Sequence, residues 1–210
     1  MRIALALFLG LSLVGPATAQ RRALVRLEND RVQVAEFKLK PGETAAVDGR
    51  YPAVTVYMAG SSLEFKPDGG HATTLAVKRG DTIFSPVGAG AIRNAGPGDL
   101  QFERISLLGP ASTETWGAAG LAPNYKVLIE NPYVRVYDIR IPAGGTEPQH
   151  THKARVVVCL SGARLKHLLP DGTEEPSTLE TGEIAWRPGA THIGQNLGNT
   201  NLWVIAVEPK

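Results

Sequence analysis

The sequence predicts an all-β protein built from two similar units in tandem. Its 210 residues include 23 Gly and 15 Pro, which recur singly between short runs of β-branched and aromatic residues. This spacing is typical of many turns that join many short strands. Beyond residue 19, no stretch keeps helical periodicity for more than about two turns. The tandem arrangement follows from comparing the chain with itself.

The two halves of the chain repeat at an offset of 102 residues. Glu28-Asn29 matches Glu130-Asn131, and after a slip of one residue Pro67-Asp68-Gly69 matches Pro170-Asp171-Gly172. Further matches fall on turn glycines, on an asparagine and on alternating valines: Val32 with Val134, Gly60 with Gly162, Gly80 with Gly182, and Asn94 with Asn196. Agreement at turns and in apolar alternation together indicates a duplication.

Strand-like runs occur at matching places in each half. They are rich in β-branched and aromatic residues and are bounded by turns that contain Gly or Pro. The clearest runs are 32–39, 54–58, 63–65, 82–86 and 100–107, with counterparts at 134–141, 156–160, 165–169, 184–188 and 202–208. Periodicity alone leaves sandwiches, Greek-key barrels and jelly rolls open.

The first nineteen residues have the three parts of a secretory signal peptide. Met1-Arg2 is followed by an apolar run and then by Pro16-Ala17-Thr18-Ala19, so cleavage is expected after Ala19. The run is shorter than the roughly 20 residues that span a bilayer, which disfavours the alternative of an uncleaved anchor. We therefore expect a periplasmic or secreted protein with no membrane span after cleavage.

The mature chain is expected to comprise three parts. Residues 20–108 form an N-terminal barrel, residues 109–126 form a linker with one short helical turn, and residues 127–210 form a C-terminal barrel. The linker is rich in Gly, Ala and Pro and has no counterpart in the repeat. The sequence leaves open whether the protein is a monomer or a small homo-oligomer.

Charge and cysteine content exclude two classes of function. Lys plus Arg number 22 against 20 Asp plus Glu, and a net charge of +2 is too small for a nucleic-acid-binding stripe. The single Cys159 cannot form an internal disulfide, and its apolar run predicts a buried hydrophobe rather than a nucleophile. The expected partner is a small-molecule ligand or substrate.

Three of the five histidines form a candidate metal site. In an extended strand, His150 and His152 point to the same face about 7 Å apart. His192 follows Pro188-Gly189 at the start of another run and can complete the set. Three imidazoles suit Fe, Zn, Cu or Ni rather than Mg or Ca. The alternative is a vestigial cluster or the lining of a polar pocket, while His71 and His167 are predicted to lie on the surface.

The second half resembles the cupins. GGTEPQHTHKARVVVCLSG looks like their first motif, G-x5-H-x-H-x3,4-E-x6-G, and GEIAWRPGATHIGQN is similar to the second, G-x5-P-x-G-x2-H-x3-N. The resemblance covers residues 127–209 well and, through the repeat, residues 25–108 in outline. It implies a bicupin, that is, two tandem jelly-roll β-barrels in one chain.

Two departures from the cupin pattern affect the expected site. The motif glutamate is replaced by Arg155, Val156 or Val157, depending on the direction of counting, so any further ligand has to come from Glu147 or from water. In the first half the three histidine positions hold other residues: Asp48, Arg50 and Gly90. The first barrel is therefore expected to be degenerate and to lack a metal site.

The resemblance implies a metal site more strongly than it implies a reaction. The leading hypothesis is a mononuclear Fe(II)-type dioxygenase or related metalloenzyme for a small, anionic organic substrate, with Zn, Mn, Ni or Cu as other candidate ions. Arg155 would orient the substrate through a bidentate contact, or else form a surface salt bridge. Trp186 and Asn196 are candidates for shaping the pocket. The alternative function is a non-catalytic envelope protein that binds a small molecule or a metal.

Overall fold

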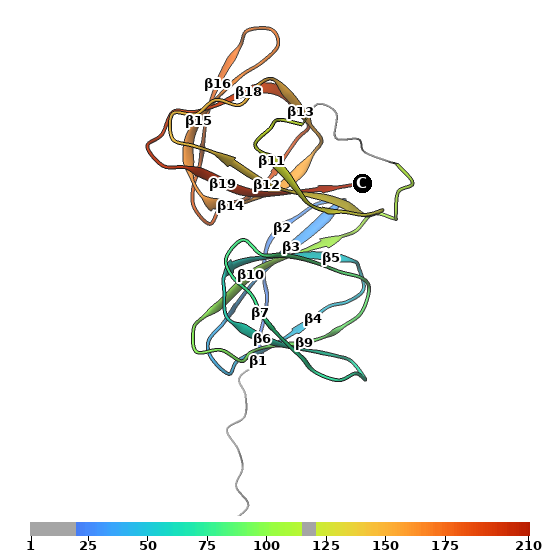
Figure 1. The fold of residues 1–210 in the computed structure, drawn as a ribbon. Coiled ribbons are helices and arrows are strands. Elements are labelled where there is room, and N and C mark those ends of the chain that lie inside the picture. Colours follow the sequence, from blue (N-terminus) through green and yellow to red (C-terminus); the bar gives the residue numbers. More distant parts are fainter. Residues whose placement is uncertain (1–19, 115–120) are drawn as a thin grey trace, which may run out of the picture.

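The computed structural model describes residues 20–114 and 121–210, so the predicted export signal at residues 1–19 lies outside it (Figure 1). Every regular element in this part of the chain is a β-strand, and no helix in it could cross a membrane. The predicted helical turn is absent from the described ends of the linker, 109–114 and 121–126. Its remaining residues, 115–120, lie outside the description.

Nineteen strands follow one another along the described residues. In the first half they are β1 (Gln20–Arg21), β2 (Leu24–Glu28), β3 (Val32–Leu39), β4 (Thr44–Val47), β5 (Ala53–Ala59), β6 (Ser62–Pro67), β7 (Thr73–Ala76), β8 (Thr82–Ser85), β9 (Gly90–Asn94) and β10 (Leu100–Leu107). In the second half they are β11 (Tyr125–Glu130), β12 (Val134–Ile141), β13 (His150–His152), β14 (Arg155–Ser161), β15 (Ala163–Leu168), β16 (Glu174–Leu179), β17 (Ile184–Arg187), β18 (Ala190–Asn196) and β19 (Leu202–Pro209).

The two halves form barrels with the same strand order. The larger sheets are β2-β3-β10-β5-β8 and β11-β12-β19-β14-β17, and the smaller sheets are β4-β9-β6-β7 and β13-β18-β15-β16. The N-terminal strand β1 adds to the first of the smaller sheets by parallel pairing with β4. The duplication read from the sequence is therefore a duplication of topology, and the alternating runs predicted as strands are strands.

Matching turns hold the two barrels in the same shape. Gly42 and Gly144 both have left-handed backbone, with φ of 83° and 72°, a conformation that favours glycine. Asn94 and Asn196 are both buried, and each amide closes the turn that follows its own strand. The Asn196 side chain donates to the carbonyl oxygens of Ile141 and Thr200, at 3.0 and 2.8 Å.

Each barrel has an apolar interior, and a third apolar cluster joins the barrels. The shared cluster is built from the outward faces of the two larger sheets, which contribute valines such as Val34, Val54, Val136 and Val156. Figure 1 shows these sheets facing each other, with β2 and β3 of the first barrel beside the second. Trp186 packs against this cluster, so it is an inter-barrel residue and does not line the cavity beside the three histidines.

Candidate metal centre

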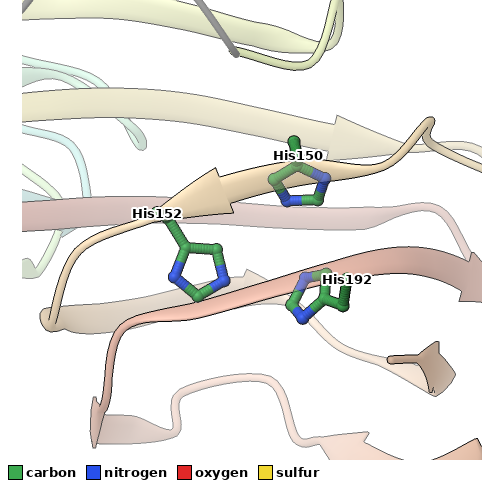
Figure 2. Close-up of side chains that lie close together, drawn as sticks. All are labelled: His150, His152 and His192. Atoms are coloured by element: carbon green, nitrogen blue, oxygen red, sulfur yellow. The ribbon is translucent and has the colours of Figure 1, made fainter. Parts of the chain in front are cut away.

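Antiparallel pairing of β13 with β18 brings three histidines together. His150 lies directly opposite His192 in the ladder, and His152 lies on the same face two residues further on. All three side chains point into the second barrel (Figure 2) and are buried, with exposed fractions of 4–6%. Each offers one ring nitrogen to a cluster whose members all lie within 4.8 Å of one another. The arrangement can hold a metal ion.

Burial keeps two of these rings uncharged. Burial, together with the charge of the nearby Arg155 guanidinium, lowers the pKa of His152 to about 2. Burial likewise lowers the pKa of His192 to about 3, with the neighbouring His167 adding to the effect. Metal ions bind the neutral imidazole, so both rings are in their ligand form at neutral pH without loss of a proton to solution.

The hydrogen bonds of the rings distinguish their nitrogens. His150 Nδ1 donates to the Pro148 carbonyl oxygen at 2.9 Å, which leaves Nε2 as an acceptor for the Tyr125 hydroxyl at 3.0 Å. His152 Nδ1 accepts from the Arg155 guanidinium, which only donates, so the proton of the neutral ring is on Nε2, which is buried without a partner. A buried polar atom without a partner is costly. The three residues fit a transition metal as nitrogen ligands, with His152 Nε2 available once its proton moves to Nδ1 and the Arg155 contact is released.

Glu147 supplies a carboxylate beside the cluster. Its Oε1 lies 3.6 Å from His150 Nε2, and its Oε2 accepts a hydrogen bond from the Asn124 amide at 2.9 Å. Gly194 makes room for it, since a Cβ there would lie 2.3 Å from Oε1. The carboxylate that the sequence lacks at the motif position is thus present at the site from another position.

Arg155 lies in the wall of a small cavity inside the second barrel. The cavity measures about 60 Å³, and its polar wall includes Tyr125, Glu147, Arg155, His167, Arg187 and His192. Arg155 is 9% exposed and its Nε has no hydrogen-bond partner. It is therefore not a surface salt bridge, which was one of the two roles considered from the sequence. An anion in the cavity would find a buried guanidinium beside the histidines.

Two residues of this site escaped the sequence analysis. His167 is not on the surface: its ring stacks on His192 with a centroid distance of 4.3 Å and lines the cavity. Tyr125 begins β11 inside the segment predicted as linker. The signal for His167 was its position two residues after Leu165, because residues at this spacing lie on the same face of a strand and Leu165 is buried. The prediction for His71 is confirmed, because it is exposed.

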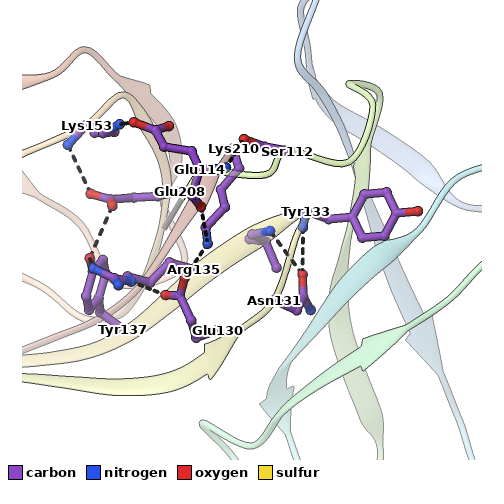
Figure 3. A network of polar contacts seen from close by, with 11 residues as sticks. Ser112, Glu114, Glu130, Asn131, Tyr133, Arg135, Tyr137, Lys153, Glu208 and Lys210 are labelled. Carbon is purple, nitrogen blue, oxygen red and sulfur yellow. Dashed lines mark hydrogen bonds and ion pairs between the residues drawn. The ribbon is translucent and has the colours of Figure 1, made fainter. Parts of the chain in front are cut away.

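A polar network supports the loop that follows His152 (Figure 3). Glu208, 2% exposed on β19, accepts from the Lys153 backbone N–H at 3.1 Å and from the Tyr137 hydroxyl at 3.3 Å. Burial raises the pKa of Glu208, and the Arg155 guanidinium partly offsets this. The network fixes the chain directly after His152 and places a carboxylate near Arg155, so it orients both residues.

The first barrel has no equivalent of the cluster. Asp48 and Arg50 are exposed and pair with each other at 2.6 Å, and Gly90 has no side chain to offer. Among residues 20–114 and 121–210, only the second barrel brings three candidate metal ligands together. The predicted burial of Cys159 is confirmed, and burial raises the pKa of its thiol to about 11.

Known proteins resemble this chain in structure and not in sequence. No family model matches the sequence, and no curated protein matches it. A cupin 2 conserved barrel domain protein from Leptotrichia buccalis is 15% identical with a TM-score of 0.57, over 94% of this chain and 93% of that one. AerE from Microcystis aeruginosa is 13% identical with a TM-score of 0.60, over 90% and 97%.

A single-substitution variant of oxalate decarboxylase from Bacillus subtilis is 14% identical with a TM-score of 0.62, over 91% of this chain and 78% of that one. Likeness at this level of identity is a likeness of fold. The strand order, the duplicated barrels and these neighbours agree. The chain has the cupin fold twice in tandem, which is the architecture of a bicupin.

Proposed function

We propose that the second barrel binds one transition metal ion through His150, His152 and His192, and that the protein is a metal-dependent enzyme for a small carboxylic acid. The observation that carries the proposal is the convergence of three buried imidazoles within 4.8 Å, one of which has an Nε2 without a partner. Nitrogen ligands favour Fe(II), Zn, Ni or Cu over Ca or Mg, and Mn is a further candidate ion. Fe(II) remains the leading candidate from the sequence.

A transition metal bound there supplies Lewis-acid and redox chemistry at coordination positions that the three histidines leave open. The chain's own residues bind and orient the substrate. Arg155 carries a buried positive charge in the cavity wall, and a carboxylate is its natural bidentate partner. A cavity of about 60 Å³ is well below the about 150 Å³ that holds benzene, so the substrate is smaller than that ring.

Glu147 is the proposed proton acceptor of the site. Its carboxylate is 5% exposed and its Oε1 faces the histidine cluster, while Asn124 holds Oε2. A carboxylate at this place can take a proton from a molecule in the cavity and return it. Tyr125 donates to His150 Nε2, and its hydroxyl would be free for a molecule in the cavity if that nitrogen held an ion.

Two reaction classes fit these residues. Oxidation by O2 is the expectation from the sequence, and decarboxylation is the reaction named for the oxalate decarboxylase that resembles this fold. The small cavity with a buried arginine favours a short-chain acid in either case. We also propose that the protein works after export, as its first nineteen residues predict.

The metal site is tested by elemental analysis of the purified full chain. We expect about one transition metal ion per chain for the wild type, none for a His150→Ala, His152→Ala double variant, and an unchanged content for His71→Ala, which removes an exposed histidine of the first barrel. Circular dichroism checks that the double variant stays folded. A wild-type protein that takes up none of Fe, Mn, Ni, Cu or Zn would overturn the proposal.

The enzyme hypothesis is tested with the metal-loaded protein and a panel of one- to three-carbon acids. O2 consumption and CO2 release distinguish the two reaction classes. Arg155→Gln should raise KM for the acid at least about tenfold, because a charged hydrogen bond is lost. The same change should preserve or strengthen metal binding, because it removes a positive charge beside His152. Metal binding without turnover of any acid would favour a binding protein.

A further inference from the structure

The first barrel encloses a cavity of its own, which the histidine site does not explain. It measures about 190 Å³, against about 60 Å³ for the cavity of the second barrel. Most of its wall is apolar, with Val47, Leu63, Phe65, Ile83 and Ile92 among the lining residues. An apolar cavity of about 150 Å³ is enough to bind benzene. The first barrel therefore has room for a ring or a branched hydrocarbon chain.

One charged side chain, Arg104, lies in this apolar wall. It is 5% exposed, and its Nε is buried without a hydrogen-bond partner. Its Nη2 donates to the Asp48 carbonyl oxygen at 3.2 Å. The Asp48 carboxylate is instead held at the surface by Arg50, at 2.6 Å. Among the described residues no carboxylate forms a direct ion pair with Arg104, and the Asp48 charge acts on it only from beyond ion-pair distance.

A buried charge without a partner is destabilising, and fold stability alone gives no reason to keep it. Arginine stays protonated even where burial lowers its pKa, as burial does for Arg104. A carboxylate from outside the chain would complete its hydrogen bonds with the planar geometry that a guanidinium prefers. Arg104 therefore marks a place for an anionic group at one end of an apolar cavity.

We propose that the first barrel binds a small apolar monocarboxylate about the size of benzoate, with its carboxylate on Arg104 and its hydrocarbon part against the apolar wall. Thr55, Tyr57 and Ser85 also line the cavity and offer hydroxyl groups. Burial raises the pKa of Tyr57 to about 12, so its hydroxyl stays protonated and can donate to the bound carboxylate. One charged anchor in an apolar pocket is the usual composition of a small-molecule site.

A ligand can reach this cavity from solvent past β7. Thr73 and Leu75 belong to that strand, line the cavity and are exposed, Leu75 to 44%. Exposed Gly88 lies in the wall as well. The site shares no residue with the histidine cluster, which lies in the other barrel. The inference is therefore independent of the proposed metal chemistry.

Calorimetric titration of the full chain with benzoate tests the site, with benzamide as a neutral molecule of the same shape. We expect saturable binding of benzoate, at one site per chain, and at least about tenfold weaker binding of benzamide, because it cannot neutralise Arg104. Arg104→Gln should weaken benzoate binding at least about tenfold and leave benzamide unaffected. Arg155→Gln, the same substitution at the buried arginine of the second barrel, should leave benzoate affinity unchanged.

Stability measurements separate a ligand-binding arginine from a structural one. In the absence of ligand, Arg104→Gln should keep or raise the urea midpoint of unfolding, because it removes a buried charge without a direct ion pair. Leu75→Trp, a change at the mouth that leaves Arg104 intact, should weaken benzoate binding without affecting that midpoint. No saturable binding to the wild type, equal binding by Arg104→Gln, or loss of binding only in Arg155→Gln would each overturn the proposal.

Discussion

In both barrels one five-stranded sheet faces the partner barrel and a second sheet closes the interior, but the enclosed spaces differ in size and chemistry. The first is mostly apolar around one arginine and measures about 190 Å³, while the second mixes aliphatic side chains with histidines, Glu147 and two arginines and measures about 60 Å³. The strand order and the closing asparagines are the same. The comparison shows that the framework depends on turns and outward faces, while a few inward positions determine the chemistry.

Those inward positions can be paired through the offset of 102 residues. Ala45 corresponds to Glu147, Phe65 to His167 and Ile92 to Gly194. In the first barrel all three are apolar and pack in its interior cluster. In the second barrel the first two bring polar groups to the cavity, and the glycine leaves room for the carboxylate. One barrel therefore keeps an apolar interior and the other presents ligands.

A difference in strand register separates the barrels as well. Thr44 pairs with Arg93, and the equivalent Thr146 bridges Gln195, so the two ladders begin alike. Further along, Val47 pairs with Gly90, so the offset predicts that Gln149 pairs with His192. The observed partner of His192 is instead His150, one residue further along the chain. Pro148 interrupts this stretch and cannot donate a ladder hydrogen bond. The shift directs His150 inward.

The largest expected effect tests whether the framework is common to both barrels. Asn94→Ala and Asn196→Ala should each lower the free energy of unfolding by about 3 kcal/mol, because each leaves several buried backbone groups without a partner. Urea denaturation measures both, and the exposed Asn199→Ala is the control, with little change expected. Clearly unequal losses would show that the two turns do not have the same role.

The next effect tests the difference between the interiors. Gly194→Ala should displace the Glu147 carboxylate from His150, because the new Cβ would lie 2.3 Å from Oε1. Metal affinity, measured by competition with a chelator, should fall by about tenfold, as is typical when a group that supports the ligands is disturbed. Ile92→Val at the matching place in the first barrel should leave metal affinity unaltered. If the Gly194→Ala variant kept the full metal affinity, Glu147 would not contribute to the metal site.

The smallest effect concerns the outward faces, where Glu103 occupies the position that Ile205 has in the second barrel. Burial raises the pKa of Glu103 to about 7, and the negative charge of Glu36 across the ladder contributes to this shift. The folded state then binds a proton that the unfolded state has lost, so stability falls as pH rises from about 4.5 to about 7 and stays low above this range.

Glu103→Gln should therefore raise the free energy of unfolding by about 1 kcal/mol at pH 8 and change it little at pH 4.5. Urea denaturation at both pH values provides the measurement. Glu36→Gln should act differently: it loses the ion pairs with Lys38 at 2.8 Å and Arg26 at 3.2 Å, and it should bring the pKa of Glu103 closer to its ordinary value. An equal increase in the free energy of unfolding at both pH values would contradict a raised pKa for Glu103.

Much of the fold was predictable because turn residues and alternation are local signals. The runs 32–39, 100–107 and 134–141 coincide with strands β3, β10 and β12. The histidine set was predictable as well, since i, i+2 spacing in a strand places two side chains on one face. The closeness of His167 to His192 comes from pairing of β15 with β18, and that of Tyr125 to His150 comes from packing between the two sheets, so neither could be read from spacing along one strand.

The duplication, the all-β class, the position of the three histidines and the loss of the motif glutamate follow from the amino-acid sequence, because each depends on residue identity at a fixed spacing. The three-dimensional arrangement sets which carboxylate approaches the cluster and how large each cavity is, and it leaves Arg155 and Arg104 each buried with an Nε that has no partner. These properties arise from strand register and from packing across the barrel, where residues far apart in sequence come into contact.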